Sequence, residues 1–292
     1  MDDIGWRCAP EPSYGPRMPV TSPLWIGGPP GAGKSTVAQL LARRHGLRWY
    51  NADAHTWEHR DRALVARHPA AVRWEALSPT ERWVAPRAEL LEMSLHRERG
   101  AMILDDVRAL PAAPLTVVEG TPVTPAVTGD RAVWLLPTPF VLRSRLAERD
   151  LAAGVRTLYE LLAEEIAREV RGHRTIVVDG RLCVEETVTA VERVFAGALR
   201  EGPTATTPTE RRALLRYANL AIVTQFRTYA ARPWASPEAL ATVRPFACEC
   251  GASDCTAAVA LPVDEYRTPV LAAGHAERLD SPEPPRGRPP RC

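Results

Sequence analysis

The sequence predicts an α/β fold, a three-layer α/β/α sandwich around a parallel sheet, with a small helical and cysteine-rich module at its C-terminal end. Short apolar runs alternate with amphipathic helical stretches over residues 24–199, which is typical of parallel strands joined by right-handed crossovers. A glycine-rich turn follows the first apolar run. Three cysteines lie close together near the C-terminus, which in a reducing compartment indicates a metal site.

The first strand is expected at 24–26 and leads through the glycine-rich turn into a helix over 34–45, which Gly46 should end. The other strands are expected at 47–50, 115–120, 132–136 and 175–180. The other helices are expected at 101–110, 140–170, 184–199 and 210–230, with a mostly helical segment at 56–99. Within that segment Ser78 and Glu81 have the spacing of a capping box.

Composition divides the chain of 292 residues into five parts. Prolines near both ends predict a flexible arm and a disordered tail, and a stretch rich in Gly, Pro and Thr predicts a linker. The expected order is a flexible arm (1–20), the α/β domain (21–200), a linker (201–209), the helical and cysteine-rich module (210–276) and a disordered tail (277–292).

Composition also limits the class of protein. A hydrophobic content of 45% with 25% charged residues is typical of a globular protein. The net charge of +2 argues against a broad nucleic-acid surface. The sequence has no apolar run of about 18 residues, and two aspartates follow the first methionine in place of an apolar leader. We therefore expect a cytoplasmic protein without a membrane span.

The glycine-rich turn matches the pattern G-x-x-x-x-G-K-[ST] between a strand and a helix. Inward-pointing backbone N–H groups and the helix N-terminus favour a bound phosphate there. The expected ATP-binding residues are Gly28, Gly31, Ala32, Gly33, Lys34, Ser35 and Thr36. Lys34 is the only lysine among 37 basic residues and would contact the β- and γ-phosphates, while Ser35 would bind Mg²⁺. Without a second lysine, the sequence cannot contain the Asn/Thr-Lys-x-Asp motif of GTPases.

Two carboxylates follow predicted strands, and such positions face the ligand in parallel sheets. Asp53 follows the second strand, where it can orient an acceptor hydroxyl and take its proton. Glu119 ends the third strand. The alternatives are structural: Asp53 could cap the next helix, and Glu119 could pair with an arginine.

A run of arginines in the helical stretch 140–170 predicts a cationic lid. Arg143, Arg145 and Arg149 could neutralise phosphate charge and exclude water from the reaction. The alternative is a solvated helix face, the usual meaning of such a charge run.

Residues 24–199 resemble the P-loop kinases of small molecules, the group of gluconate, shikimate, adenylylsulfate and chloramphenicol kinase-like enzymes. The resemblance depends on Gly28–Thr36, Asn51–Asp53, Val117–Gly120, Trp134–Arg149 and Val177–Gly180. It implies that Asp53 contacts the acceptor or metal, that Glu119 binds the acceptor or a Mg²⁺-bound water, and that lid arginines close over the phosphates. Residues 54–110 would then bind the acceptor.

The function expected from these motifs is transfer of the γ-phosphoryl group of Mg-ATP to a small hydroxylated acceptor, with Lys34, Asp53 and Glu119 as catalytic residues beside the arginines. One alternative is an ATP-dependent regulatory switch whose output is the cysteine-rich module. Another is a kinase of nucleic-acid 5′ ends, which the near-neutral net charge disfavours.

The C-terminal cysteines suggest a structural zinc site with Cys248, Cys250, Cys255 and His275 as ligands. Free or redox-active thiols are the alternative, because C-x-C is less diagnostic than C-x₂-C. The stretch resembles a small bacterial module with the pattern F-x-C-E-C-x₄-C, followed by Glu-Tyr and Gly-His. We expect it to be structural or to bind a protein partner. His55 and His59 have metal-ligand spacing but lack a third ligand.

Overall fold

A five-stranded parallel sheet forms the centre of the computed structural model, which describes residues 22–149 and 151–276. Its strand order is β2-β3-β1-β4-β5. The strands are β1 (Leu24–Gly27), β2 (Arg48–Asn51), β3 (Thr116–Glu119), β4 (Ala132–Pro137) and β5 (Thr175–Val178). The strand β1 is central: β3 and β2 lie on one side of it, and β4 and β5 lie on the other. The topological switch point of the sheet is therefore next to β1, and open parallel sheets bind ligands at such a point.

Ten helices and three short 3₁₀ turns are present in the described residues. The helices are α1 (Lys34–His45), α2 (Thr56–Val65), α3 (Pro69–Ala76), α4 (Pro79–Val84), α5 (Arg87–Met93), α6 (Glu98–Ala109), α7 (Pro139–Ala147), α8 (Ala153–Glu169), α9 (Val184–Glu201) and α10 (Pro208–Ala230). The 3₁₀ turns are η1 (Ala52–His55), η2 (Ala239–Ala241) and η3 (Val263–Glu265).

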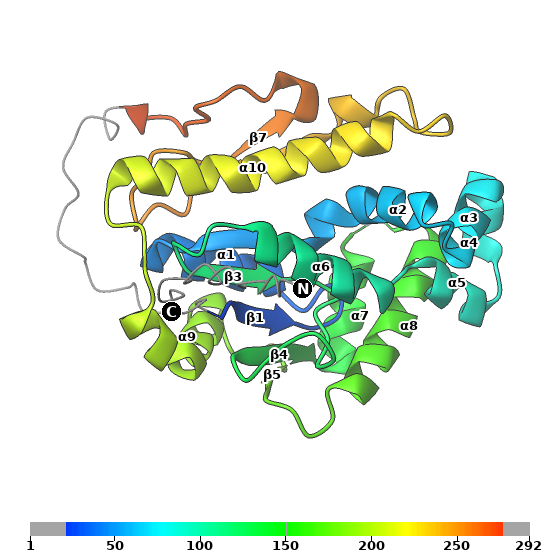
Figure 1. Ribbon diagram of the computed structural model, residues 1–292, viewed down its shortest axis with the longest axis horizontal. Coiled ribbons are helices and arrows are strands. Elements are labelled where there is room, and N and C mark those ends of the chain that lie inside the picture. Colours follow the sequence, from blue (N-terminus) through cyan, green and yellow to red (C-terminus); the bar gives the residue numbers. More distant parts are fainter. Residues whose placement is uncertain (1–21, 150, 277–292) are drawn as a thin grey trace, which may run out of the picture.

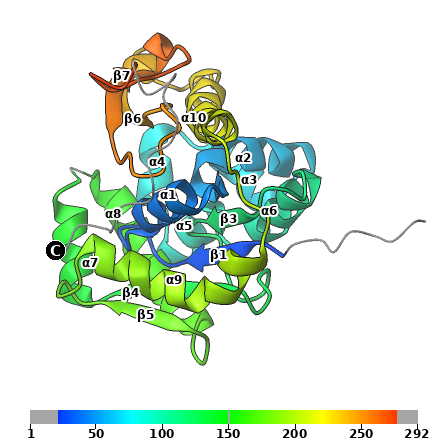
Figure 2. The ribbon, with the colours of Figure 1, turned by 90° about the vertical axis from the view of Figure 1, so that its left-hand side faces the viewer.

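Helices cover both faces of the sheet, so the predicted three-layer α/β/α fold is confirmed (Figure 1, Figure 2). On one face, α1 and α9 bury apolar side chains such as Leu41 and Phe195 against β1, β3 and β4. On the other face, α5, α6 and α8 bury Leu90, Ile103 and Leu162 around the indole of Trp134. Each such side chain contributes about 1.5–3 kcal/mol relative to an exposed one, and together they fix the position of β1.

One expected helix is divided in the structure. The stretch 140–170 forms α7 and α8, which are separated by residues 148–152. A Cβ at Gly154, in the first turn of α8, would lie 2.4 Å from the Cβ and carbonyl oxygen of Trp83. Glycine at this position therefore lets the first turn of α8 pack closely on α4. The capping box of Ser78 and Glu81 is present at α4, as predicted.

The C-terminal module consists of α10 and an antiparallel hairpin, β6 (Val243–Ala247) and β7 (Ala258–Pro262). The sequence analysis predicted the helix but neither strand. Phe246 and Tyr266 form the centre of its small core against Val223 of α10. Figure 2 shows α10 and the hairpin together, above α1 and α2. The module has a core of its own and also packs on the α/β domain through α10.

The expected linker is hydrogen-bonded to the α/β domain. Leu115 donates its backbone N–H to Pro203 O at 2.7 Å, and Ala205 donates to Gly46 O at 2.8 Å. Gly46 ends α1, as expected, with a φ of 63°. The predicted arm 1–20 and tail 277–292 lie outside the described residues. In the described part of the chain, no helix is both long and apolar enough to cross a bilayer.

The start of α10 gives a test of how the module is attached. The Thr207 hydroxyl accepts a hydrogen bond from Glu210 N at 3.2 Å, and the Glu210 carboxylate accepts one from Thr207 N at 3.0 Å. Replacing an N-cap hydroxyl with alanine costs about 1 kcal/mol. We expect Thr207→Ala to lower the free energy of unfolding by about that amount in urea titrations. Thr207→Ser keeps the hydroxyl and should match the wild type; equal losses in both variants would contradict this role.

Candidate functional site

The glycine-rich turn joins β1 to α1 in a backbone conformation that suits an anion. Gly28, Gly31 and Gly33 have φ values of 137°, 84° and 92°. A Cβ at Gly28 would lie 2.3 Å from Leu135 O, so only glycine fits there. Gly33 is the N-cap of α1 and supplies no capping side chain. The first N–H groups of α1 therefore remain available to a phosphate at the carboxyl edge of the sheet.

Lys34 is the cation of this turn and is 5% exposed. Its Nζ donates to Pro29 O at 3.0 Å and lies 3.5 Å from the Thr121 hydroxyl oxygen. Burial lowers the pKa of Lys34, and the negative charges of Asp53 and Glu119 oppose that shift. Ser35 and Thr36 lie next to Lys34 on the exposed face of the first helical turn.

Asp53 is linked to Lys34 through a threonine that the sequence analysis missed. The Thr121 hydroxyl donates to Asp53 Oδ2 at 3.2 Å, while its oxygen faces Lys34 Nζ. The side chain that caps η1 is Asn51, whose Oδ1 accepts from the N–H groups of Asp53 and Ala54. Asp53 is therefore free of the capping role considered above, and its carboxylate lines the cleft. Thr121 lies two residues beyond Glu119, directly after the strand-end glycine.

Glu119 is fully buried at the end of β3. Neither of its carboxylate oxygens makes a hydrogen bond, although the Ser35 hydroxyl and the Trp49 indole lie near enough to lower its pKa slightly. Burial raises its pKa to about 7, against the opposing effect of the Lys34 ammonium. No ion pair with an arginine forms at Glu119 within residues 22–149 and 151–276. A buried carboxylate without donors suits a cation, so this group fits a metal ion bound next to the turn.

The three arginines of the expected lid occupy different positions. Arg145 donates from Nη1 to Gly31 O at 2.9 Å and so contacts the glycine-rich turn directly. Arg149 is exposed and lines the cleft. Arg143 is exposed on α7 and is not among the residues that line the cleft. The structure thus brings Arg145 and Arg149, but not Arg143, to the turn or the cleft.

The turn opens into a cleft of about 810 Å³. Ser35, Thr36, Asp53 and Thr121 lie on its wall, together with residues from the helices between β2 and β3. Its aromatic lining comes from Trp49, Trp57, Trp74, Trp83, Tyr159, Phe226, Tyr229 and Trp234. Several of these, Trp74 among them, also pack in the core. The cleft is large enough for a small-molecule ligand site.

Residues of the C-terminal module complete this cleft, which the sequence did not reveal. The Gln225 amide of α10 donates to Asp53 O at 3.2 Å and accepts from Trp57 N at 3.1 Å. Gln225 and Asp53 are 172 residues apart in the sequence. Arg99, also unpredicted, places Nη1 3.9 Å from Asp53 Oδ1. A lone glutamine in an amphipathic helix has no sequence pattern that could have indicated this contact.

The cysteines and histidine predicted as metal ligands come together in the structure. Ligand atoms of Cys248, Cys250, Cys255 and His275 all lie within 4.8 Å of one another. His275 Nδ1 is 3.3 Å from Cys248 Sγ and 3.5 Å from Cys255 Sγ. Tetrahedral zinc with ordinary bond lengths would separate such N and S atoms by about 3.6 Å. The three cysteines are buried and unpaired, so this Cys₃His group can hold a metal ion.

Glu249, between the first two cysteines, is a structural residue that the sequence analysis did not assign. Its carboxylate is fully buried and accepts hydrogen bonds from Asn219 of α10, from the Tyr266 hydroxyl and from the Thr268 hydroxyl. These contacts attach residues 248–255, which we call the cysteine loop, to α10. They also explain the Glu-Cys and Glu-Tyr parts of the motif in physical terms, because Tyr266 is the second partner of that carboxylate.

His55 and His59 each contact a carboxylate. His55 Nδ1 lies 2.6 Å from Glu58, and His59 Nε2 lies 2.7 Å from Asp106. Neither belongs to a group of three or more metal-binding side chains in the described part of the chain. His55 thus has a partner within its own helical segment, whereas His59 joins α2 to α6.

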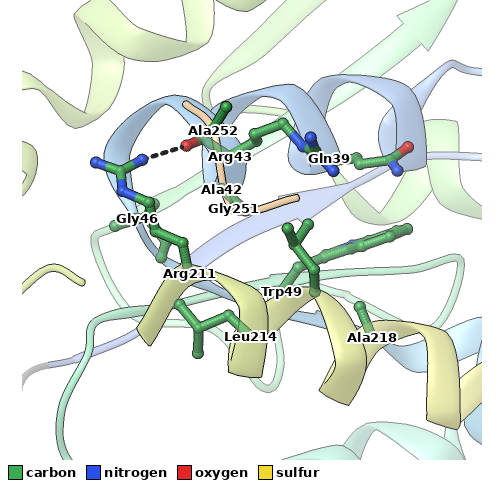
Figure 3. Close-up of a pocket in the computed structure, with 12 residues that line it drawn as sticks. Gln39, Ala42, Arg43, Gly46, Trp49, Arg211, Leu214, Ala218, Gly251 and Ala252 are labelled. Carbon is green, nitrogen blue, oxygen red and sulfur yellow. Dashed lines mark hydrogen bonds between the residues drawn. The ribbon is translucent and has the colours of Figure 1, made fainter. Parts of the chain in front are cut away.

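The cysteine loop also contacts the far end of α1. Arg43 donates to Cys248 O at 2.6 Å, and Arg211 of α10 donates to Arg43 O at 2.9 Å. Figure 3 shows these side chains around a cavity of about 20 Å³, lined mainly by apolar groups. A space of that size holds about one water molecule. The cavity is a small packing void where α1, α10 and the cysteine loop meet, and it is too small for a metabolite.

Comparisons with known proteins identify no family for this chain. No protein-family model matches the sequence, and no curated protein matches it. Among solved structures, the chain is similar to an unliganded sugar kinase from Janibacter sp. HTCC2649. The two are 18% identical, and the alignment covers 61% of this chain and 96% of the sugar kinase, with a TM-score of 0.33. The functional assignment therefore depends on the geometry of this chain alone.

The raised pKa of Glu119 predicts a pH effect on stability. Its pKa is about 7 when folded and 4.5 without the protein environment. Between these values the folded state binds more protons than the unfolded state, so this group makes stability fall as pH rises from about 5 to 7. We expect Glu119→Gln to gain stability relative to the wild type over that interval in urea titrations at pH 5, 6.5 and 8. The exposed Glu201→Gln should follow the wild type, and an unchanged pH slope in Glu119→Gln would refute the prediction.

Proposed function

We propose that this chain is an ATP-dependent kinase that transfers the γ-phosphoryl group of Mg-ATP to a small hydroxylated acceptor. One observation carries the proposal. A cleft of about 810 Å³ is lined both by Ser35 and Thr36 of the glycine-rich turn and by the carboxylate of Asp53. This volume is near the upper end of ligand sites, about 300–1,000 Å³, as suits a nucleotide beside a small acceptor.

The nucleotide phosphates would lie on the N–H groups of the turn and of α1, with the Lys34 ammonium beside them. Bound Mg²⁺ would neutralise charge on the β- and γ-phosphates. The residues that fit this ion are Ser35, whose hydroxyl is exposed, and Glu119, whose carboxylate lacks a donor. Arg145 holds the turn in shape through Gly31 O, and Arg149 faces the cleft, where it can meet the transferred group.

In the reaction, the acceptor hydroxyl oxygen forms a bond to the γ-phosphorus while the bond from that phosphorus to the β,γ-bridging oxygen breaks, and ADP leaves. Asp53 accepts the hydroxyl proton. Thr121 orients the Asp53 carboxylate by donating to Oδ2, and its oxygen faces Lys34. Positioning and charge neutralisation are the main contributions such a site can make, because the step needs no covalent protein intermediate.

The test is ADP formation from Mg-ATP with a panel of sugars, sugar acids, nucleosides and hydroxylated antibiotics as acceptors. We expect one acceptor class to stimulate ADP release, and Lys34→Ala to reduce this stimulated kcat by at least about a hundredfold, since one lost transition-state donor costs about 10²–10³. Arg193→Ala, on the exposed face of α9, should retain wild-type rates. Nucleotide binding without acceptor-dependent turnover would instead favour the regulatory switch.

We also propose that the Cys₃His group binds one structural zinc ion. Support comes from three buried thiols, a histidine nitrogen at suitable distances, and a loop with too small a core to fold alone. Four protein ligands leave no open position for catalysis.

Metal analysis of the purified protein tests the zinc proposal. We expect about one zinc per chain in the wild type, and a loss of metal with a lower thermal midpoint in Cys255→Ser, because binding energy contributes to folding. The neighbouring Thr256→Ala alters an exposed residue and should keep the metal. Full zinc occupancy in Cys255→Ser, or none in the wild type, would contradict the assignment.

A further inference from the structure

The cleft carries far more positive than negative charge. Its only lining carboxylate in the described part of the chain is that of Asp53. Its lining arginines are Arg60, Arg82, Arg99, Arg149 and Arg244. Such a surface attracts an anion, and the nucleotide phosphates account for the positive groups next to the turn. The arginines between α2, α4 and α10 are not explained by ATP.

Arg60 of α2 stands out among these groups. It lines the cleft and is 4% exposed. Its Nη2 donates to Met93 O at 2.7 Å, but Nε and Nη1 have no hydrogen-bond partner. The guanidinium lies over the indoles of Trp74 and Trp57, at 4.5 and 5.7 Å from the ring centroids. A buried guanidinium with two unsatisfied nitrogens is unfavourable unless a ligand completes it.

Two carboxylates of α2 and α3, those of Asp61 and Glu75, contact other basic or polar side chains. Asp61 pairs with Arg232 at 2.6 Å. Glu75 accepts a hydrogen bond from Trp234 Nε1 at 2.7 Å and lies 3.8 Å from both Arg82 and Arg232. Arg232 and Trp234 belong to the C-terminal module, directly after α10. The module therefore shares the acidic groups beside the cleft, and the negative charge of Glu75 acts on Arg60 with no ion pair or hydrogen bond between them in the described part of the chain.

We infer that Arg60 binds the anionic group of the acceptor, a carboxylate or a phosphate, in the part of the cleft that α10 and the residues after it enclose. The inference rests on the proposed kinase function and names its substrate class: small hydroxylated acids or phosphate monoesters. Guanidinium groups suit these anions because several N–H donors can meet their oxygens.

The positions of Arg60 and Asp53 agree with such an acceptor. Asp53 in η1 and Arg60 in α2 are seven residues apart along nearly continuous helical backbone, which corresponds to about 10 Å. A small metabolite can place a hydroxyl at Asp53 and an acidic group toward Arg60 over that span. The nucleotide phosphates lie at the other side of Asp53, on the glycine-rich turn, so Arg60 serves the acceptor.

Calorimetric titration of the full chain without nucleotide tests this inference apart from catalysis. The probes are inorganic phosphate and two matched pairs, gluconate with glucitol and AMP with adenosine. In the wild type we expect the charged member of at least one pair to bind at least about tenfold more tightly than the neutral one, in line with the strength of charged hydrogen bonds. Arg60→Met, similar in size but uncharged, should remove that preference and weaken phosphate binding.

Arg193→Met, which alters an exposed residue of α9, serves as the control and should keep the preference for the charged ligand. Circular dichroism of Arg60→Met checks that the variant is folded during the titration, because the change also removes the hydrogen bond to Met93 O. Equal affinity for charged and neutral members, no binding of any charged probe, or an unchanged preference in Arg60→Met would overturn the inference. Turnover of neutral acceptors alone would overturn this inference and leave the kinase proposal intact. Charge-selective binding through Arg60 without any phosphoryl transfer would support the anion site and contradict the kinase proposal.

Discussion

The buried ammonium of Lys34 is the interaction on which the rest of the site depends. A cation with 5% exposure needs nearby negative charge, and the fold supplies Asp53 and Glu119 from the ends of two neighbouring strands. Those carboxylates can approach it only because β3 lies between β1 and β2 in the sheet. The strand order, the glycine turn and the position of α1 are thus parts of one electrostatic arrangement, which exists in the protein before any ligand arrives.

The second organising element is α10, which belongs to no strand–helix repeat. It contacts η1 through Gln225, the end of α1 through Arg211, and the cysteine loop through Asn219. A single helix therefore connects the end of α1, the wall of the cleft at η1 and the candidate metal centre. The sequence of α10 combines polar and apolar residues because each face of the helix meets a different partner. Its polar side chains bind backbone groups, and its apolar side chains fill the small C-terminal core.

The sequence predicted the sheet and the glycine-rich turn between β1 and α1 because both depend on local patterns: apolar runs, helix spacing and glycines before a helix. It also placed Asp53 and Glu119, since strand ends in parallel sheets meet at one edge. It missed Thr121, Arg99 and Gln225, whose positions follow from contacts over long sequence separations. The β6–β7 hairpin was missed for a similar reason, because its exposed strands carry no regular alternation and are held by packing on α10.

The attachment of residues 203–205 to β3 and α1 has a consequence for how the protein is made. The sheet can assemble once β5 and α9 have left the ribosome, yet the cleft then still lacks the wall formed by α10. During that interval one side of the cleft is open to solvent. Synthesis of α10 closes that side, so the enclosed site forms only after the sheet that supports it.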